Sequence, residues 1–203
     1  MKKFIFGVCL AATVSLAAGT AMADSIKGRI GVTGKIGVLA PADSDYGDSR
    51  IEPDIGYVLG GGILAGIDDH FAAEIDVTRT DYGSDFPKSG NAGDFGITNV
   101  SLGGQYRFEI TNTKLVPYVG FGLDILMSDY DNAPNGRTHD VDTTVGVHVS
   151  GGIDYFINKQ LALTAEVKAL AAPETDIQDS TGKQGNFNPS SVSCTAGVRF
   201  FFN

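Results

Sequence analysis

The sequence predicts an all-β protein, an eight-stranded antiparallel transmembrane up-and-down β-barrel. Eight stretches alternate apolar side chains with glycine or small polar ones, which is the period of a strand with two different faces. The connections between these stretches alternate between long polar loops and short turns. After the first 23 residues no apolar run reaches the roughly 18 residues of a spanning helix. If the chain crosses a membrane, it must therefore do so as a closed barrel.

Residues 1–23 have the pattern of a cleaved signal peptide. Lys2 and Lys3 precede an apolar run, Phe4–Ala18, and Ala21-Met22-Ala23 provides a small-residue cleavage site. We expect residues 24–203 to form one outer-membrane β-barrel domain. Loss of Lys2 and Lys3 takes the formal net charge from -9 to -11, which argues against nucleic acid as a partner. Cys194 is the one cysteine left, so no disulfide can form within the domain.

The first four expected strands share the alternating pattern but differ in what opposes the apolar face. Gly28–Ala40 alternates aliphatic residues with Gly, Thr and Lys. Asp54–Ile67 places aliphatic residues opposite mostly glycine, and Phe71–Thr80 places them opposite acidic residues and threonine. Phe95–Ile110 places its apolar residues opposite a mixture of glycine, polar and charged residues. Each stretch predicts a strand with one apolar and one small or polar face.

The last four expected strands follow the same rule. Leu115–Ser128 carries a proline near its start, where a strand tolerates one. Thr144–Tyr155 has the most regular alternation, and Leu161–Leu170 places leucine, alanine and valine opposite Thr, Glu and Lys. Ser191–Phe202 closes the chain with one apolar face that ends in aromatic residues. A closing strand of this kind is typical of a transmembrane barrel.

The connections indicate which end of the barrel faces the periplasm. Short turns are expected at Asp68-Asp69-His70, Thr111-Asn112-Thr113 and Asn158-Lys159, and the other connections are long and polar. Outer-membrane barrels have short periplasmic turns and longer extracellular loops. We therefore expect both termini on the periplasmic side. The long loops are rich in aspartate and glutamate, which leaves open whether they bind divalent cations that bridge lipopolysaccharide phosphates.

The apolar face is expected to contact lipid. Glycine, serine and threonine dominate the opposite face, and they suit a crowded interior better than a solvated surface. Aromatic residues gather near the strand ends on the short-turn side, as in an interfacial girdle: Phe71, Phe108, Tyr155, Phe200 and Phe202. The alternative is a soluble lipocalin-like periplasmic binding barrel, which would turn the apolar set inward around a ligand.

The inward face carries charged residues that must pair, because an isolated charge is costly to bury. Counting from the short turns places Glu74 and Arg107 at similar heights on adjacent strands, which predicts an ion pair. The network either plugs the barrel or lines a narrow polar conduit, and the small interior of eight strands favours the plug. The predicted lumen charge network consists of Lys35, Glu74, Asp76, Arg107, Glu109, Asp124, Asp154, Glu166, Lys168 and Arg199.

No residues point to an enzyme, a cofactor or a metal site. His148-x-Ser150 is similar to the His-x-Ser motif of lipid A deacylase barrels, which keeps a lipid A-modifying barrel enzyme as an alternative. Gly151 and Gln160 stand where that motif would have an asparagine and an acid. The strand phase also places His148 and Ser150 in the lumen, away from acyl chains. We therefore expect no catalytic residue.

Three internal motifs and the closing strand resemble the OmpW and OmpA-like families of small Gram-negative outer-membrane barrels. They are Gly34-Lys35-Ile36-Gly37-Val38, Pro117-Tyr118-Val119-Gly120-Phe121-Gly122, Tyr155-Phe156-Ile157-Asn158-Lys159 and Gly197-Val198-Arg199-Phe200-Phe201-Phe202. The resemblance implies a place in the outer membrane, among lipid and lipopolysaccharide. It implies a passive role, either envelope integrity or porin-like, restricted passage of small solutes. In OmpW-like proteins an apolar lumen with a lateral opening is thought to pass small hydrophobic compounds.

The resemblance also implies that the barrel-assembly machinery recognises the C-terminal strand. Such proteins use a terminal aromatic residue as the assembly signal, and this chain ends in Asn203. We expect Phe200 and Phe202 to serve as that signal here.

Overall fold

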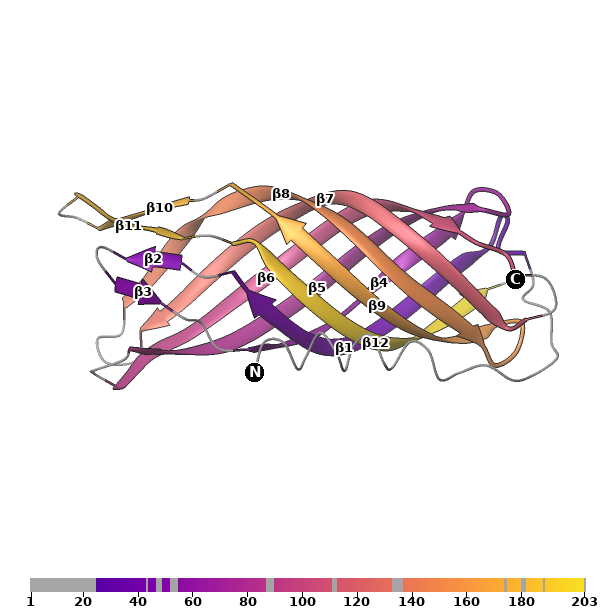
Figure 1. Cartoon of the computed structure of the whole chain (residues 1–203), viewed down its shortest axis with the longest axis horizontal. Coiled ribbons are helices and arrows are strands. Elements are labelled where there is room, and N and C mark those ends of the chain that lie inside the picture. Colours follow the sequence, from indigo (N-terminus) through magenta and orange to yellow (C-terminus); the bar gives the residue numbers. More distant parts are fainter. Residues whose placement is uncertain are drawn as a thin grey trace.

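The computed structural model is a closed antiparallel β-barrel (Figure 1). It describes residues 25–42, 44–46, 49–51, 55–86, 90–110, 113–132, 137–173, 175–179, 182–187 and 189–202. Side chains are described for residues 25–42, 55–81, 96–110, 113–127, 143–173 and 189–202. The predicted signal peptide lies outside the described residues, so its cleavage stays a prediction. Within the described residues, no helix is long and apolar enough to cross a membrane.

Eight long strands form the barrel wall in the order β1-β12-β9-β8-β7-β6-β5-β4. The first and last strands pair antiparallel, from Ile30 opposite Phe202 to Pro41 opposite Ser191, so the wall has no free edge. The predicted fold class is confirmed. The strands of the wall are β1 (Ile30–Pro41), β4 (Gly56–Gly66), β5 (Phe71–Phe86), β6 (Gly90–Arg107), β7 (Leu115–Asn132), β8 (Arg137–Phe156), β9 (Leu161–Ala171) and β12 (Ser191–Phe202).

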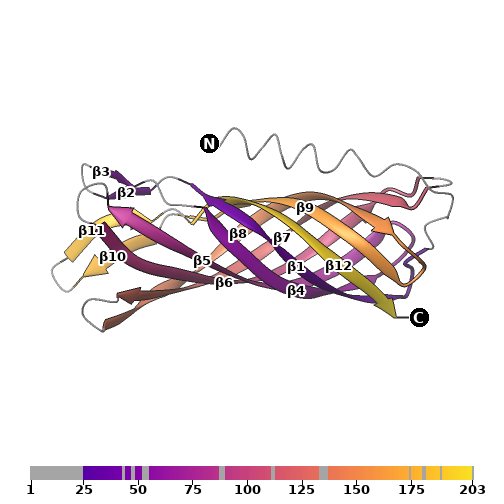
Figure 2. The same cartoon turned by 90° about the horizontal axis from the view of Figure 1, so that it is seen from below.

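Beyond the wall, the stretches that the sequence predicts as long polar loops contain further strands. A four-stranded sheet in the order β10-β11-β2-β3 lies at the end opposite the C-terminus, called here the loop end (Figure 2). Strands β5 to β8 also extend further toward the loop end than predicted. Once a neighbouring strand sets the register, the backbones of polar residues form ladder hydrogen bonds as readily as those of apolar residues. The four short strands are β2 (Ser44–Tyr46), β3 (Ser49–Ile51), β10 (Thr175–Asp179) and β11 (Gly182–Phe187).

The side chains of most acidic residues in the predicted loops lie outside the described residues. The question of cation binding by these loops, which the sequence left open, is therefore not tested by the described residues.

Side chains alternate between the lumen and the outer surface along each strand. On β1, Thr33 and Lys35 are each 6% exposed, whereas Val32 is 39% and Ile36 is 64% exposed. Aliphatic and aromatic residues of the other wall strands are similarly exposed, among them Leu59, Ile75, Phe121 and Val149. The apolar face therefore points outward, toward lipid. The soluble alternative, which needs the apolar face inside, is wrong.

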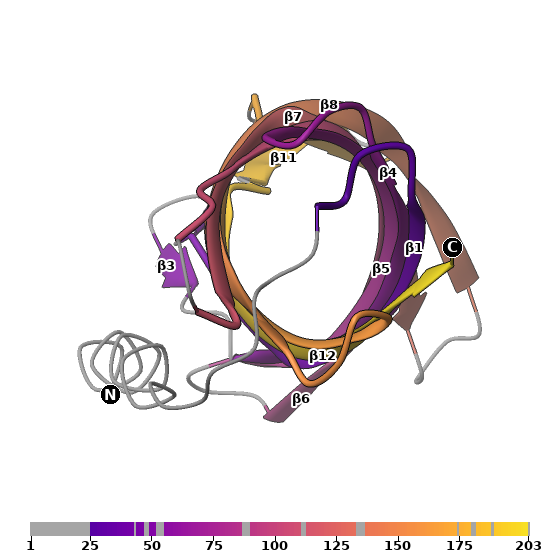
Figure 3. The same cartoon turned by 90° about the vertical axis from the view of Figure 1, so that its right-hand side faces the viewer.

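The turns at Asp68-Asp69-His70 and Asn158-Lys159 lie together at the end of the barrel where β12 ends, called here the short-turn end (Figure 3). Thr111 and Asn112 of the third expected turn lie outside the described residues. Aromatic rings gather on the outer surface of the short-turn end. Tyr106 packs edge-on against Phe71, with 5.1 Å between ring centroids, and against Phe108, with 5.0 Å. Phe200 and Phe202 pack edge-on with centroids 5.2 Å apart. These rings form a band of the kind found at membrane interfaces.

The turn between β4 and β5 is organised by the Asp68 carboxylate. The backbone N–H groups of Phe71 and His70 both donate to Asp68 Oδ1 at 2.7 Å. These two hydrogen bonds, that of Phe71 first, stabilise the charged form and hold the pKa of Asp68 below its usual range. Asn158 organises the turn between β8 and β9 in the same way, accepting from the N–H groups of Gln160 and Leu161 at 2.9 Å.

Asp68 is expected to stabilise the folded barrel at neutral pH and to lose that effect in acid. Because its folded pKa is lowered, its contribution is present above the pKa of the unfolded chain, at about 3.9, and is lost as the pH falls through the folded value. Unfolding of the wild type and Asp68→Ala should therefore be compared between neutral and acidic pH. The stability gap should close in acid, and a gap that does not change with pH would contradict this role.

Candidate functional site

The lumen is the candidate functional site, because inward side chains from all wall strands meet there. From the short-turn end to the loop end it contains an apolar cluster, a layer of ion pairs and a cavity. Each strand contributes through alternate residues, so one register determines the whole arrangement.

The apolar cluster closes the short-turn end. Phe201 is fully buried and stacks on Phe156 with ring centroids 5.5 Å apart. Ile26, which precedes β1, enters the same cluster and is 4% exposed. This cluster was not predicted from the sequence, although Phe156 and Phe201 have the same strand phase as the lumen residues Asp154 and Arg199. Its members are Ile26, Leu64, Ala72, Val116, Phe156, Ala162 and Phe201.

The part of the ion-pair layer nearer the short-turn end centres on Asp154 and Arg199. Asp154 Oδ2 accepts from Arg107 Nη2 at 2.6 Å and from Arg199 Nη1 at 2.8 Å. Arg199 Nη2 donates to Glu74 Oε1 at 2.8 Å, and Gln105 donates to the other oxygen of Glu74. All of these charged side chains are at least nine-tenths buried. Four strands, β5, β6, β8 and β12, are thereby joined across the lumen.

The predicted ion pair between Glu74 and Arg107 is wrong. Glu74 lies opposite Gly103 on β6, and Arg107 lies four residues further toward the short turn, where its N–H bonds the carbonyl of His70. The two side chains therefore differ in height, and each pairs with an opposite charge on a non-adjacent strand, Glu74 with Arg199 on β12 and Arg107 with Asp154 on β8. Gln105 connects them, since it accepts from Arg107 Nη1 at 3.2 Å while donating to Glu74.

The part of the layer nearer the loop end has two centres. Lys35 Nζ lies 2.8 Å from Asp76 Oδ2 and 3.6 Å from Glu166 Oε1, and Tyr118 donates to the second oxygen of Glu166 at 3.2 Å. Asp124, which is fully buried, forms the other centre. It accepts from Asn99 Nδ2 at 2.8 Å and from Ser101, contacts His148 Nδ1, and has Lys168 Nζ at 3.9 Å; these contacts come from β6, β8 and β9.

Nine of the ten charged residues predicted for the lumen lie there. Eight of these side chains are buried, and that of Lys168 is 12% exposed. The placement of Glu109 is wrong: it is exposed and lies beyond Arg107, where β6 ends and strand alternation no longer applies. His148 belongs to the layer through Asp124 and was missing from the predicted network.

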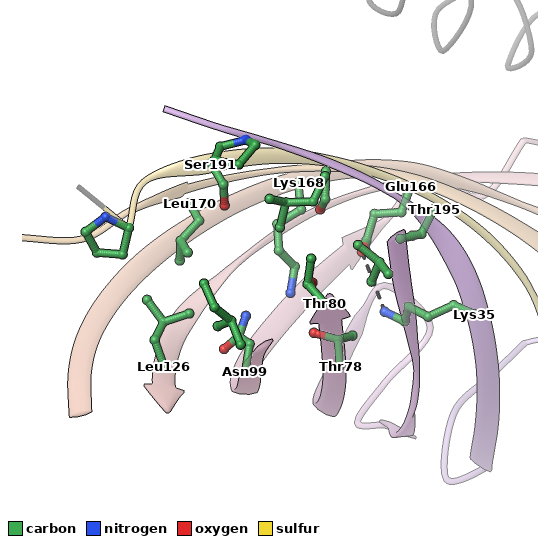
Figure 4. Close-up of a pocket in the computed structure, with 16 residues that line it drawn as sticks. Lys35, Thr78, Thr80, Asn99, Leu126, Glu166, Lys168, Leu170, Ser191 and Thr195 are labelled. Atoms are coloured by element: carbon green, nitrogen blue, oxygen red, sulfur yellow. Dashed lines mark ion pairs between the residues drawn. The ribbon is translucent and has the colours of Figure 1, made fainter. Parts of the chain in front are cut away.

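The free space that borders the described ion pairs is small. A cavity of about 50 Å³ lies on the loop-end side of the ion pairs, and Lys168, Asn99 and Thr80 project into it (Figure 4). Below it, a void of about 10 Å³ lies among Glu74, Asp76, Ser101 and His148. A single water needs roughly 10–15 Å³ of such space. This void among the described side chains therefore has room for about one water, which is too little for a larger solute.

An apolar hollow marks the outer surface of the wall over β6 to β9. Outward residues such as Phe121 and Val147 line it, and His148 and Leu170 reach it from the lumen side. Leu170 also lines the cavity at the loop end. The apolar lumen that the OmpW resemblance implies is not found, because ion pairs fill the middle of this barrel.

The His148-x-Ser150 motif lies on the lumen side of β8. His148 uses Nδ1 to contact Asp124 on β7, and both His148 and Ser150 border the void inside the ion-pair layer. Among the described residues, no group of three or more His, Cys, Asp or Glu side chains has the arrangement of a metal site.

Comparisons with known proteins agree with this architecture. The family model described as "Outer membrane protein beta-barrel domain" matches residues 8–200. OprG from Pseudomonas aeruginosa is similar in structure, with a TM-score of 0.74 at 17% identity, over 90% of this chain and 100% of that one. Neisserial surface protein A gives 0.64 at 17% identity, over 91% and 100%. Outer membrane protein W of E. coli gives 0.54 at 16%, over 87% and 98%.

At these identities the solved structures show the fold alone. No curated protein sequence matches the chain. The family model covers nearly all of the chain, and the lipid-facing barrel described above is what such a family requires. The protein is a small eight-stranded barrel of the outer membrane, and it belongs to the outer membrane protein beta-barrel domain family.

Proposed function

We propose that this protein is a passive, non-conducting barrel that contributes to envelope integrity. The observation that carries the proposal is the filled lumen. The apolar cluster and the ion-pair layer lie in series, and the free space between the charged side chains is about 10 Å³. A solute would have to separate several buried ion pairs, which is costly when each charge loses its partner. This supports the plug over the polar conduit.

An enzymatic role is less well supported than a structural one. The imidazole of His148 is directed to Asp124 inside the ion-pair layer. An acyl chain in the bilayer would have to enter a space of about 10 Å³ to reach Ser150. We infer that His148 acts as a structural partner of Asp124.

The wild-type protein is expected to be electrically silent in planar bilayers. The refolded barrel should be reconstituted after its heat-dependent gel mobility has shown that it is folded, and current should be recorded at high salt. Absence of current steps is the expected result, because the ion pairs occupy the lumen cross-section. An Arg107→Ala variant, which lacks one of the lumen cations, is the control that shows whether any current passes through the lumen. Discrete openings of the wild type that change in Arg107→Ala would overturn the proposal in favour of restricted solute passage.

A further inference from the structure

The segment Ser25–Arg29 folds back across the short-turn end of the barrel before β1 begins. The indigo start of the described chain lies over the barrel mouth in Figure 3. The segment pairs with the end of β4, since Gly28 N donates to Gly66 O and Gly66 N donates to Arg29 O, both at 2.9 Å. Arg29 N also donates to Ile26 O at 2.9 Å, which closes a tight turn.

This turn depends on Gly28, which has a φ of 70°. That left-handed conformation costs a residue with a Cβ roughly 1–2 kcal/mol. No atom lies within 4 Å of the position that a Cβ on Gly28 would take, so a substitution there would strain the backbone without a collision. The chain therefore reverses direction where glycine permits it, and the reversal directs Ile26 into the mouth.

The segment inserts one apolar side chain and leaves its neighbours outside. Ile26 is 4% exposed within the apolar cluster, whereas Ser25 and Lys27 are exposed. Gly66 allows the close approach, because a Cβ there would collide with the carbonyl oxygen of Ile26. The burial of Ile26 thus depends both on the apolar cluster and Gly66, called here the seat of Ile26, and on the backbone conformation of the segment.

Contacts at both ends hold the segment over the mouth. Ser25 donates to the Asp69 carboxylate in the turn between β4 and β5. Arg29 Nη2 donates to the carbonyl of Lys159, in the turn between β8 and β9, at 2.7 Å. The Arg29 guanidinium also lies over the ring of Phe201, 5.1 Å from its centroid. These turns flank β1 on opposite sides, so the segment spans the opening.

We propose that Ser25–Arg29 is an intramolecular plug that seals the short-turn mouth of the barrel, with Ile26 as the sealing side chain. The plug is separate from the ion-pair layer above it. Its release exposes the apolar cluster and the underside of the ion pairs to water at the short-turn end. This inference concerns access to the mouth and does not require that the lumen conducts or stays silent.

Thiol labelling tests the plug directly. Leu64, which is fully buried and belongs to the same apolar cluster as Ile26, is replaced by cysteine in a mature chain that carries Cys194→Ser. A charged, membrane-impermeant maleimide then reports access from water in the folded, reconstituted protein. Ile26→Asp should accelerate labelling by about 10- to 100-fold, the range that corresponds to burial of an isoleucine side chain. The matched control, Lys27→Asp, changes an exposed neighbour and should leave labelling slow.

A second variant keeps the test valid if Ile26→Asp folds poorly. Gly28→Val alters no residue of the seat and acts only through the strained φ, so it should accelerate labelling by about tenfold. Gel mobility without heating confirms that each variant is folded. Equal labelling rates in the parent, Gly28→Val and Ile26→Asp would overturn the proposal, as would rapid labelling of the parent itself.

Discussion

Replacing Asp154 by asparagine is expected to lower the free energy of unfolding by about 3–5 kcal/mol, the usual cost of breaking a buried ion pair. Asp154 is fully buried, and one of its oxygens accepts from both Arg107 and Arg199. Asparagine keeps the shape but removes the charge, so two buried guanidinium groups lose the anion between them. The effect should be measured by reversible urea unfolding of the barrel in lipid vesicles.

Asp81→Asn is the matched control for this prediction. Its carboxylate pairs with Arg79 at 3.1 Å, but the two side chains are 72% and 44% exposed. A surface pair of this kind contributes about 0–1 kcal/mol, because water screens both charges. If Asp154→Asn were no more destabilising than Asp81→Asn, the ion-pair layer would not hold the barrel together, and the structural role proposed for it would be wrong.

The alternation of residue types was sufficient to predict the wall of the barrel from sequence. β12 begins and ends at the predicted residues, and β9 differs by one residue. The period of two also assigned lumen and lipid faces, because one register determines every side chain in a strand. The strand extensions toward the loop end were missed, since backbone pairing beyond the membrane does not require apolar alternation.

Membership of the lumen was easier to predict than its contacts. Strand alternation places a side chain inside, but the partner depends on strand tilt and on side-chain length across the lumen. Glu74 therefore pairs with Arg199, which is far away in the sequence, rather than with Arg107. Glu109 shows the limit of alternation itself, because it lies past the last paired residue of β6. Ile26 belongs to no strand, so no periodic pattern could find it.

The aromatic residues at the end of β12 have two different orientations, which correspond to two different roles. Phe201 is fully buried and packs on Phe156 and under Arg29. Phe200 and Phe202 point outward and are 37% and 48% exposed. Their role as an assembly signal stays a prediction. It concerns the two outward rings, whereas the packing role belongs to Phe201, which lies between them in the sequence.

Phe201→Ala is accordingly expected to lower the free energy of unfolding by about 3–5 kcal/mol, because it removes a buried ring and leaves a cavity in the apolar cluster. The cluster cannot collapse freely, since the closed ladder of β-strand hydrogen bonds holds the surrounding backbone. The matched control is Phe200→Ala on the outward face, where lipid chains refill the space and the stability loss should be smaller. Urea unfolding in vesicles measures both losses, and the rate of folding by purified barrel-assembly machinery measures recognition. We expect Phe201→Ala to act mainly on stability and Phe200→Ala mainly on assembly rate; the opposite pattern would show that recognition depends on the buried ring.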